Sequence, residues 1–164
     1  MTPHEESAPP SVNAMGEDRY EIAAVERFDC TPEELWTLLC DWERFVEVGL
    51  PGMTSAFRWL SGGPRHAPSR FEFTIAGAVL KEEIYELSAD LPGQRYRARY
   101  RALEPALGVL EYDAVLDARP GDGPGTVLET VREVRLMPGS PPDLLVGMIA
   151  GEMQSLKAHF AGGA

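Results

Sequence analysis

Cysteine is scarce in this chain of 164 residues, in which Cys30 and Cys40 are the only two. The sequence predicts that Cys30 lies just before a helix and that Cys40 lies in the last turn of that helix. A rise of about 1.5 Å per residue then separates them by well over the roughly 7 Å that a disulfide tolerates between Cα atoms. We therefore predict two free thiols, as in a reducing compartment, and no zinc site.

Long apolar runs are missing as well. The longest, near residues 144–153, is interrupted by Gly147, Gly151 and Glu152, and it is too short to span a bilayer. Residues 1–16 carry acidic side chains in place of the basic and then apolar pattern of a secretory leader. These features predict a cytoplasmic protein that has no membrane partner.

Positive charge is also in short supply. The chain contains 15 Lys and Arg against 26 Asp and Glu, which gives a net charge of −11. Such a charge repels phosphate backbones and anionic membrane surfaces. Residues 95–101 do alternate arginine with tyrosine and alanine, but neighbouring strands are predicted to place acidic residues on the same outer face, so cross-strand ion pairs are expected there. Nucleic acid is therefore not an expected partner.

Several catalytic motifs are absent too. The sequence has no Gly-x-Ser-x-Gly elbow, which would present a nucleophilic serine, and no His and Cys cluster with the spacing of a metal site. The glycine-rich residues 121–125 are predicted to link two strands and not to open a helix, so they are not expected to bind phosphate. The sequence thus predicts neither a metal nor a cofactor.

What is present indicates one soluble domain. Hydrophobic residues make up 44% of the chain and charged residues 25%, and both fractions are ordinary for a globular protein. Residues 1–18 are rich in Pro, Ser and Glu without periodicity, and we predict that they form a disordered tail. Residues 19–161 are predicted to form a single ordered domain.

The predicted elements follow in the order strand, two short helices, six strands and one long helix. Residues 19–29 alternate as in a strand, and residues 31–34 have the threonine, proline and glutamate of a capping box that begins a helix. A second short helix is predicted at residues 43–48. Six strands are predicted at residues 53–60, 69–76, 78–87, 94–103, 109–118 and 126–136, and a long amphipathic helix follows and ends at Phe160.

These elements predict an α+β fold. The short connections between strands indicate an antiparallel meander, and the long C-terminal helix is the element left to cover its apolar face. We predict a helix-grip fold, in which a seven-stranded curved sheet wraps around that helix with two short helices after the first strand. A cavity is expected between the helix and the sheet, where ligand sites often form.

This order resembles the START-related, Bet v 1-like (SRPBCC) superfamily, and in particular its polyketide cyclase/dehydrase branch. The resemblance extends over residues 19–161. Its local matches are residues 29–36 after the first strand, residues 77–87 with 90–93, and the closing residues 156–159. It implies a deep hydrophobic pocket without a metal. The superfamily includes enzymes, lipid carriers and hormone receptors, so fold alone does not select among these functions.

The candidate site consists of polar side chains that share a face with apolar ones. These are Glu26, Glu82, Tyr112 and Glu129 on predicted strands and Glu152 on the long helix. Glu129, for example, is predicted to point inward together with Val127 and Val131. A carboxylate with few solvent contacts has a raised pKa and can act as a general acid or base near neutral pH.

The resemblance points to the same positions. Similarity to the receptor branch implies that Glu82, Tyr112 and Glu129 contact the ligand and that Glu152 faces the pocket. The lysine that binds a carboxylate in those receptors has no counterpart between residues 42 and 49, so an acidic ligand is not expected. The cyclase branch implies a pocket arginine, for which Arg70, with Arg58 behind it, is the candidate. Strand register decides which way each arginine points.

Our leading hypothesis is a cyclase/dehydrase that acts on a hydrophobic, oxygen-rich small molecule, such as one derived from a polyketide. Glu129 or Glu82 would be the general base, and Tyr112 with Arg70 would stabilise a developing enolate. Further ligand contacts are predicted at Glu26, Trp36, Thr74, Ile84, Tyr96, Tyr100, Leu144, Met148 and Glu152. The alternatives are a carrier or sensor that leaves its ligand unchanged, and a protein-interaction adaptor. A monomer and a homodimer are both compatible with the sequence.

Overall fold

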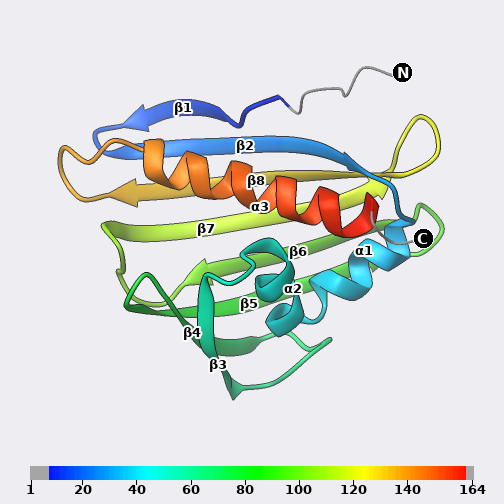
Figure 1. Ribbon diagram of the computed structural model, residues 1–164, viewed down its shortest axis with the longest axis horizontal. Helices are drawn as coiled ribbons and strands as arrows, with labels where there is room; N and C mark the ends of the chain where they lie inside the picture. Colours follow the sequence, from blue (N-terminus) through cyan, green and yellow to red (C-terminus); the bar gives the residue numbers. More distant parts are fainter. Residues whose placement is uncertain (1–7, 162–164) are drawn as a thin grey trace.

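The computed structural model describes residues 8–161 as one curved antiparallel sheet with three helices on one side of it (Figure 1). The helices are α1 (Pro32–Leu39), α2 (Trp42–Gly49) and α3 (Asp143–Ala161). The strands are β1 (Ser11–Gly16), β2 (Arg19–Phe28), β3 (Thr54–Ser61), β4 (Ser69–Ile75), β5 (Ala78–Asp90), β6 (Arg95–Ala102), β7 (Val109–Pro120) and β8 (Thr126–Leu136).

The sheet has the order β1-β2-β8-β7-β6-β5-β4-β3. Strands β3 to β8 pair with their neighbours in chain order, as a meander predicts. Strand β2 extends the sheet beyond β8 and pairs with β8 over its whole length. The predicted fold class is therefore confirmed, although the sheet has eight strands and not seven. None of the helices in residues 8–161 is long and apolar enough to cross a membrane.

The additional strand, β1, corrects the prediction of a disordered tail. Residues 11–16 pair with β2 through the backbone, from Ser11 opposite Ala23 to Gly16 opposite Arg19. Every residue of β1 is exposed, so the strand is held by ladder hydrogen bonds and contributes no buried face. A strand without a buried face has no alternating apolar pattern, which is why the sequence did not indicate it. Residues 1–7 of the predicted tail lie outside the described residues.

The start of α1 agrees with the predicted capping box. The backbone N–H of Glu34 donates to Thr31 Oγ1 at 3.1 Å, and the N–H of Thr31 donates to Glu34 Oε2 at 2.8 Å. Cys30 and Cys40 flank this helix as buried free thiols, and burial raises the pKa of each to about 11.

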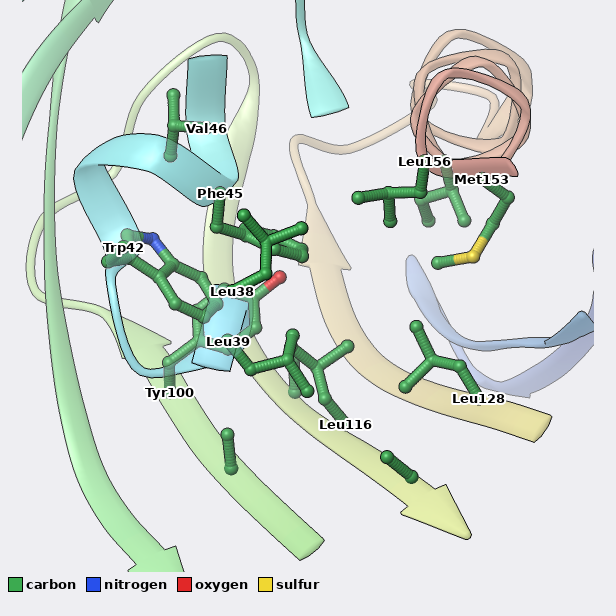
Figure 2. Packing of buried hydrophobic residues seen from close by; sticks show 14 of the residues in the cluster. Leu38, Leu39, Trp42, Phe45, Val46, Tyr100, Leu116, Leu128, Met153 and Leu156 are labelled. Atoms are coloured by element: carbon green, nitrogen blue, oxygen red, sulfur yellow. The ribbon is translucent and has the colours of Figure 1, made fainter. Parts of the chain in front are cut away.

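The core lies between the helices and the inner face of the sheet. Figure 2 shows Met153 and Leu156 of α3 pointing toward the strand that carries Leu128, while Trp42 and Phe45 of α2 fill the space beside them. The outer face carries many charged side chains, and the predicted cross-strand ion pairs are present there. Examples are Arg97 with Asp117 at 3.0 Å and Arg101 with Glu83 at 2.7 Å. The arginines of β6 are thus used within the sheet.

Candidate ligand cavity

A cavity of about 710 Å³ lies between α2, α3 and the inner face of strands β4 to β8. Its wall is mostly apolar and includes Phe73, Leu80 and Met148, while the loop between β6 and β7 borders it with Leu107 and Gly108. A volume of this size suits a drug-sized ligand. The prediction of an internal hydrophobic cavity is therefore in agreement with the structure.

Five polar side chains, all buried except the partly buried Tyr112, line this cavity, and we call them the polar cluster: Glu82, Tyr100, Tyr112, Arg132 and Glu152. They come from β5, β6, β7, β8 and α3. In residues 8–161 no group of His, Cys, Asp and Glu side chains is arranged to hold a metal ion. The polar cluster offers a ligand carboxyl, hydroxyl and guanidinium groups, and Lys81, which also lines the cavity, adds an ammonium group.

Arg132 organises the polar cluster. Its Nη1 donates to the hydroxyl oxygen of Tyr112 at 2.9 Å, and its Nη2 donates to Glu152 Oε1 at 2.9 Å. The side chain is only 3% exposed, so this ion pair lies in a region of low dielectric, where charges interact strongly. Ion pairing with Glu152 holds the pKa of Arg132 well above its usual range despite burial. Arg132 therefore remains charged and is neutralised by Glu152.

Two small residues make room for this arrangement. Ala114 of β7 lies directly between Tyr100 of β6 and Arg132 of β8 in the strand ladder. Because its side chain ends at Cβ, the longer side chains on either side can extend above it. On the helix side, Gly49 of α2 packs against Glu152, whose Cγ is 3.0 Å from the position that a Cβ of residue 49 would occupy.

The hydroxyl groups of Tyr100 and Tyr112 together have one proton that a ligand can accept. The hydroxyl oxygens of Tyr100 and Tyr112 are 2.9 Å apart. Burial raises the pKa of Tyr112 to about 12 and that of Tyr100 well above its usual range, so both stay protonated. The single hydrogen bond between them uses only one of the two hydroxyl protons, whichever oxygen donates. The other proton is available for an acceptor oxygen in the cavity.

Glu82 is the carboxyl group of the cluster that has no hydrogen-bonded partner among the described side chains. It is 8% exposed and faces the cavity. Burial raises its pKa from the ordinary value of 4.5 to about 8, the Glu152 carboxylate adds to the rise, and the Arg132 guanidinium opposes it. A carboxyl group with this pKa exchanges its proton near neutral pH, as a general acid or base must.

This raised pKa predicts a pH dependence of stability. Between pH 4.5 and about pH 8 the folded protein keeps a proton on Glu82 that the unfolded chain has lost. The free energy of unfolding is therefore expected to fall as the pH rises through this window, by up to about 1.4 kcal/mol per pH unit from this group. Urea unfolding at about pH 5.5 and about pH 7.5 measures the slope, and Glu82→Gln should remove it. An equal slope in both proteins would contradict the assignment.

Six of the predicted site residues line the cavity. They are Glu82, Tyr100, Tyr112, Leu144, Met148 and Glu152. Leu144 borders the cavity but is 73% exposed. The roles of all six in ligand binding and catalysis remain predictions.

The prediction that Glu129 points inward is wrong, and this is the most important correction. Glu129 does not face the cavity: its side chain is 43% exposed on the outer face of β8, where it accepts a hydrogen bond from Arg119 at 2.9 Å. The inward residues of β8 include Leu128, Arg132 and Val134. Both faces of β8 carry apolar residues, so alternation does not say which one is inward, and the opposite choice reverses every side chain.

For two residues of β4 the predicted inward orientation is also wrong. Arg70 is outside, 54% exposed and paired with Glu83 at 2.8 Å. Thr74 shares this outer face, because the buried residues of β4 alternate with it through Phe73 and Ile75. Arg58 is paired with Glu72 at 2.6 Å and is exposed. No arginine of β3 or β4 can therefore polarise a ligand in the cavity.

The remaining predicted contacts belong to the packed core or to another ion pair. Trp36 stacks on Tyr96 with ring centroids 5.1 Å apart, and Ile84 is buried in the core. Glu26 is on the inner face, but it accepts a hydrogen bond from Lys157 at 2.8 Å. None of these four lines the cavity. They lie on the inner side of the fold, which alternation alone cannot distinguish from a position on the cavity wall.

Arg132 is the residue of the polar cluster that the sequence analysis did not predict to face the cavity. A signal exists, since Arg132 alternates with Val134 and Leu136 and would have been inward had that face of β8 been selected. Buried arginine is rare unless it is paired, and its partner, Glu152, is twenty residues away on α3. The pair becomes recognisable only when the helix is placed against the sheet.

A sheet that grips a long helix around a cavity defines a class of ligand-binding proteins, and sequence comparison agrees with this class. The family model described as polyketide cyclase / dehydrase and lipid transport matches residues 20–161. The chain belongs to this family, and with it to the SRPBCC superfamily. Comparison with curated proteins gives no match.

Solved structures show the same fold at low sequence identity. The ginseng major latex-like protein 151 from Panax ginseng is 12% identical with a TM-score of 0.66, over 87% of this chain and 98% of that one. Truncated norcoclaurine synthase from Thalictrum flavum is 16% identical with a TM-score of 0.59, over 88% and 96%. A point mutant of that synthase in complex with a transition state analogue is 14% identical with a TM-score of 0.58, over 89% and 99%. These likenesses concern the fold alone.

Proposed function

We propose that the protein is an enzyme of the cyclase/dehydrase type, which binds a hydrophobic, oxygen-bearing small molecule in the cavity and promotes its cyclisation or dehydration. The observation that carries this proposal is Glu82, a carboxyl group that faces a largely apolar cavity without a hydrogen-bonded partner among the described side chains. A group held in this way can take up and return a proton, whereas the other carboxylate of the cluster is bound to Arg132.

Glu82 is assigned to take one proton from the substrate and to return it within the same turnover. In its ionised form, Glu82 removes a proton from a carbon next to a substrate carbonyl, which leaves an enolate. For dehydration, the protonated Glu82 then returns this proton to the departing hydroxyl group at the β carbon, and water is released. For cyclisation, the enolate carbon attacks a second carbonyl, and the new alkoxide takes the proton. In both cases Glu82 ends ionised, ready for the next turnover.

Tyr112 and Tyr100 are assigned to the substrate carbonyl. One of their hydroxyl protons is free, and the charged Nη1 of Arg132 lies 2.9 Å from the Tyr112 oxygen. A fixed donor of this kind stabilises the negative charge that develops on the enolate oxygen. The apolar wall holds the rest of the substrate and keeps a flexible chain in a reactive fold, which can supply much of the reduction in barrier.

The test works without a named substrate. A metabolite extract from a strain that lacks this gene is incubated with purified protein, and every mass is followed by liquid chromatography and mass spectrometry. We expect one species to be consumed and a product to appear that has the same mass or is lighter by one water. Recovery of a species bound to the protein but unaltered would contradict the enzyme proposal and support the carrier.

A further inference from the structure

The polar cluster contains one permanent positive charge, on Arg132, and Glu152 is its counter-charge. A second cation of the cavity wall, Lys81, is paired with Glu104 at 3.4 Å. Arg132 is buried; its Nη2 donates to Glu152 and its Nη1 to Tyr112 at 2.9 Å each, while its Nε has no hydrogen-bond partner among the described residues. An acidic ligand would therefore meet a guanidinium whose charge is already neutralised. Moving an unpaired anion out of water into such a site is strongly unfavourable.

Glu152 packs against Gly49, which has no side chain to crowd it. A Cβ on residue 49 would be 3.0 Å from Cγ and 3.8 Å from Cδ of Glu152. Gly49 is not in the left-handed region, in contrast to Gly52 and Gly77. It ends α2 in a position where the backbone tolerates other residues. The glycine is therefore needed for space and not for its backbone conformation.

We propose that Glu152, placed in the gap at Gly49, is a specificity-determining residue that makes the cavity reject anionic ligands and accept uncharged ones. This inference rests on the proposed function of the cavity as a small-molecule site and adds the class of molecule that it takes. The expected ligand presents a ketone, ester or hydroxyl oxygen to Glu82 and the tyrosine pair, and it carries no free carboxylate, sulfonate or phosphate at that end.

Two fluorescent probes with one ring skeleton test the inference. N-phenylnaphthylamine is uncharged, and anilinonaphthalene sulfonate adds a single sulfonate to the same rings. Both are titrated into the wild-type protein at neutral pH, and their dissociation constants are compared. We expect the uncharged probe to bind at least about tenfold more tightly, since specificity is a difference between two affinities.

Glu152→Gln is the decisive variant. The amide has the size of the carboxylate but lacks its charge, so Arg132 becomes available to an anion. The sulfonate probe should then bind about tenfold more tightly than in the wild type, while the uncharged probe changes by less than about twofold. The matched control is Glu26→Gln, which breaks an ion pair of similar type between the sheet and α3 outside the cavity. It should leave the preference of the cavity unchanged.

Gly49→Ala provides a second variant that keeps every charged group. The added methyl would lie 3.0 Å from Glu152 Cγ, so the Glu152 side chain has to shift. We expect this shift to weaken its pairing with Arg132 and to make the discrimination between the probes smaller. Gly151→Ala is its control, since a Cβ on Gly151 of α3 meets nothing within 4 Å. In a Glu152→Ala background the effect of Gly49→Ala should disappear, because no side chain remains for the methyl to displace.

The outcomes separate the two proposals. If neither probe binds to the wild-type protein, the cavity is not a ligand site and the proposed function fails with the inference. If both probes bind equally well, the cavity is a ligand site but the inference about charge is wrong. If Glu152→Gln does not fold, as judged by thermal unfolding, Gly49→Ala decides: unchanged discrimination in that variant would overturn the inference.

Discussion

Replacing Glu82 by glutamine is expected to lower the turnover of the substrate by about 10²–10⁴-fold, which is the usual contribution of a general acid or base. Glutamine has nearly the same size, but it cannot exchange a proton near neutral pH. The fold should be retained, because the Glu82 carboxyl has no ion pair or hydrogen bond to a described side chain that would be lost. The measurement is the initial rate of product formation on the species identified in the metabolite extract.

Glu129→Gln is the matched control for this prediction. It removes a carboxylate of the same kind from another strand of the sheet, β8, where Glu129 lies on the outer face and contacts Arg119. Its rate should equal that of the wild type. Equal rates for Glu82→Gln and the wild type would remove Glu82 from the mechanism. A loss of rate in Glu129→Gln would instead mean that the outer face of β8 takes part in the reaction.

The rate should also follow the protonation of Glu82. The base form is required to begin the reaction, so turnover is expected to increase with pH up to the region of the pKa near 8. Tyr112, with its pKa raised to about 12, remains a donor throughout this range. A profile without an inflection in this region would argue against Glu82 as the base.

Removing Arg132 is expected to have the largest effect on stability. Arg132→Met should lower the free energy of unfolding by about 3–5 kcal/mol, because it leaves the Glu152 carboxylate buried without its counter-charge. The hydroxyl of Tyr112 loses a donor at the same time. Urea unfolding followed by circular dichroism measures the change. A loss below about 1 kcal/mol would mean that the ion pair is not a main support of the fold.

Two further variants test whether the unpaired charge causes this loss of stability. In Arg132→Met/Glu152→Met both partners are replaced by apolar side chains, and most of the stability should return, since a buried ion pair can often be exchanged for hydrophobic packing. Arg97→Met removes an arginine from the outer face, where its pair with Asp117 is partly exposed. That change should lower stability by less than about 1 kcal/mol.

The sequence alone determined the order of the elements and several of their boundaries. The capping box at Thr31 and Glu34 sets the start of α1 through contacts three residues apart, and such local contacts are visible in the sequence. Short connections implied the antiparallel meander. The apolar face of β7 is unambiguous, because Ala114 and Leu116 alternate with the acidic Asp113 and Asp117, and this placed Tyr112 inside.

Only the tertiary structure decided which face of β8 and β4 is inward and which residues form the polar cluster. Alternation divides a strand into two faces, but it does not identify the covered one when both carry apolar residues, as with Val131 and Leu128. Pairing with β7 and coverage by α3 settle that choice. As a result, Arg132 faces the cavity and Glu129 lies on the outer face. The pair between Arg132 and Glu152 joins a strand to a helix across the cavity. Interactions between residues far apart in the chain depend on packing, which the local pattern of residues does not encode.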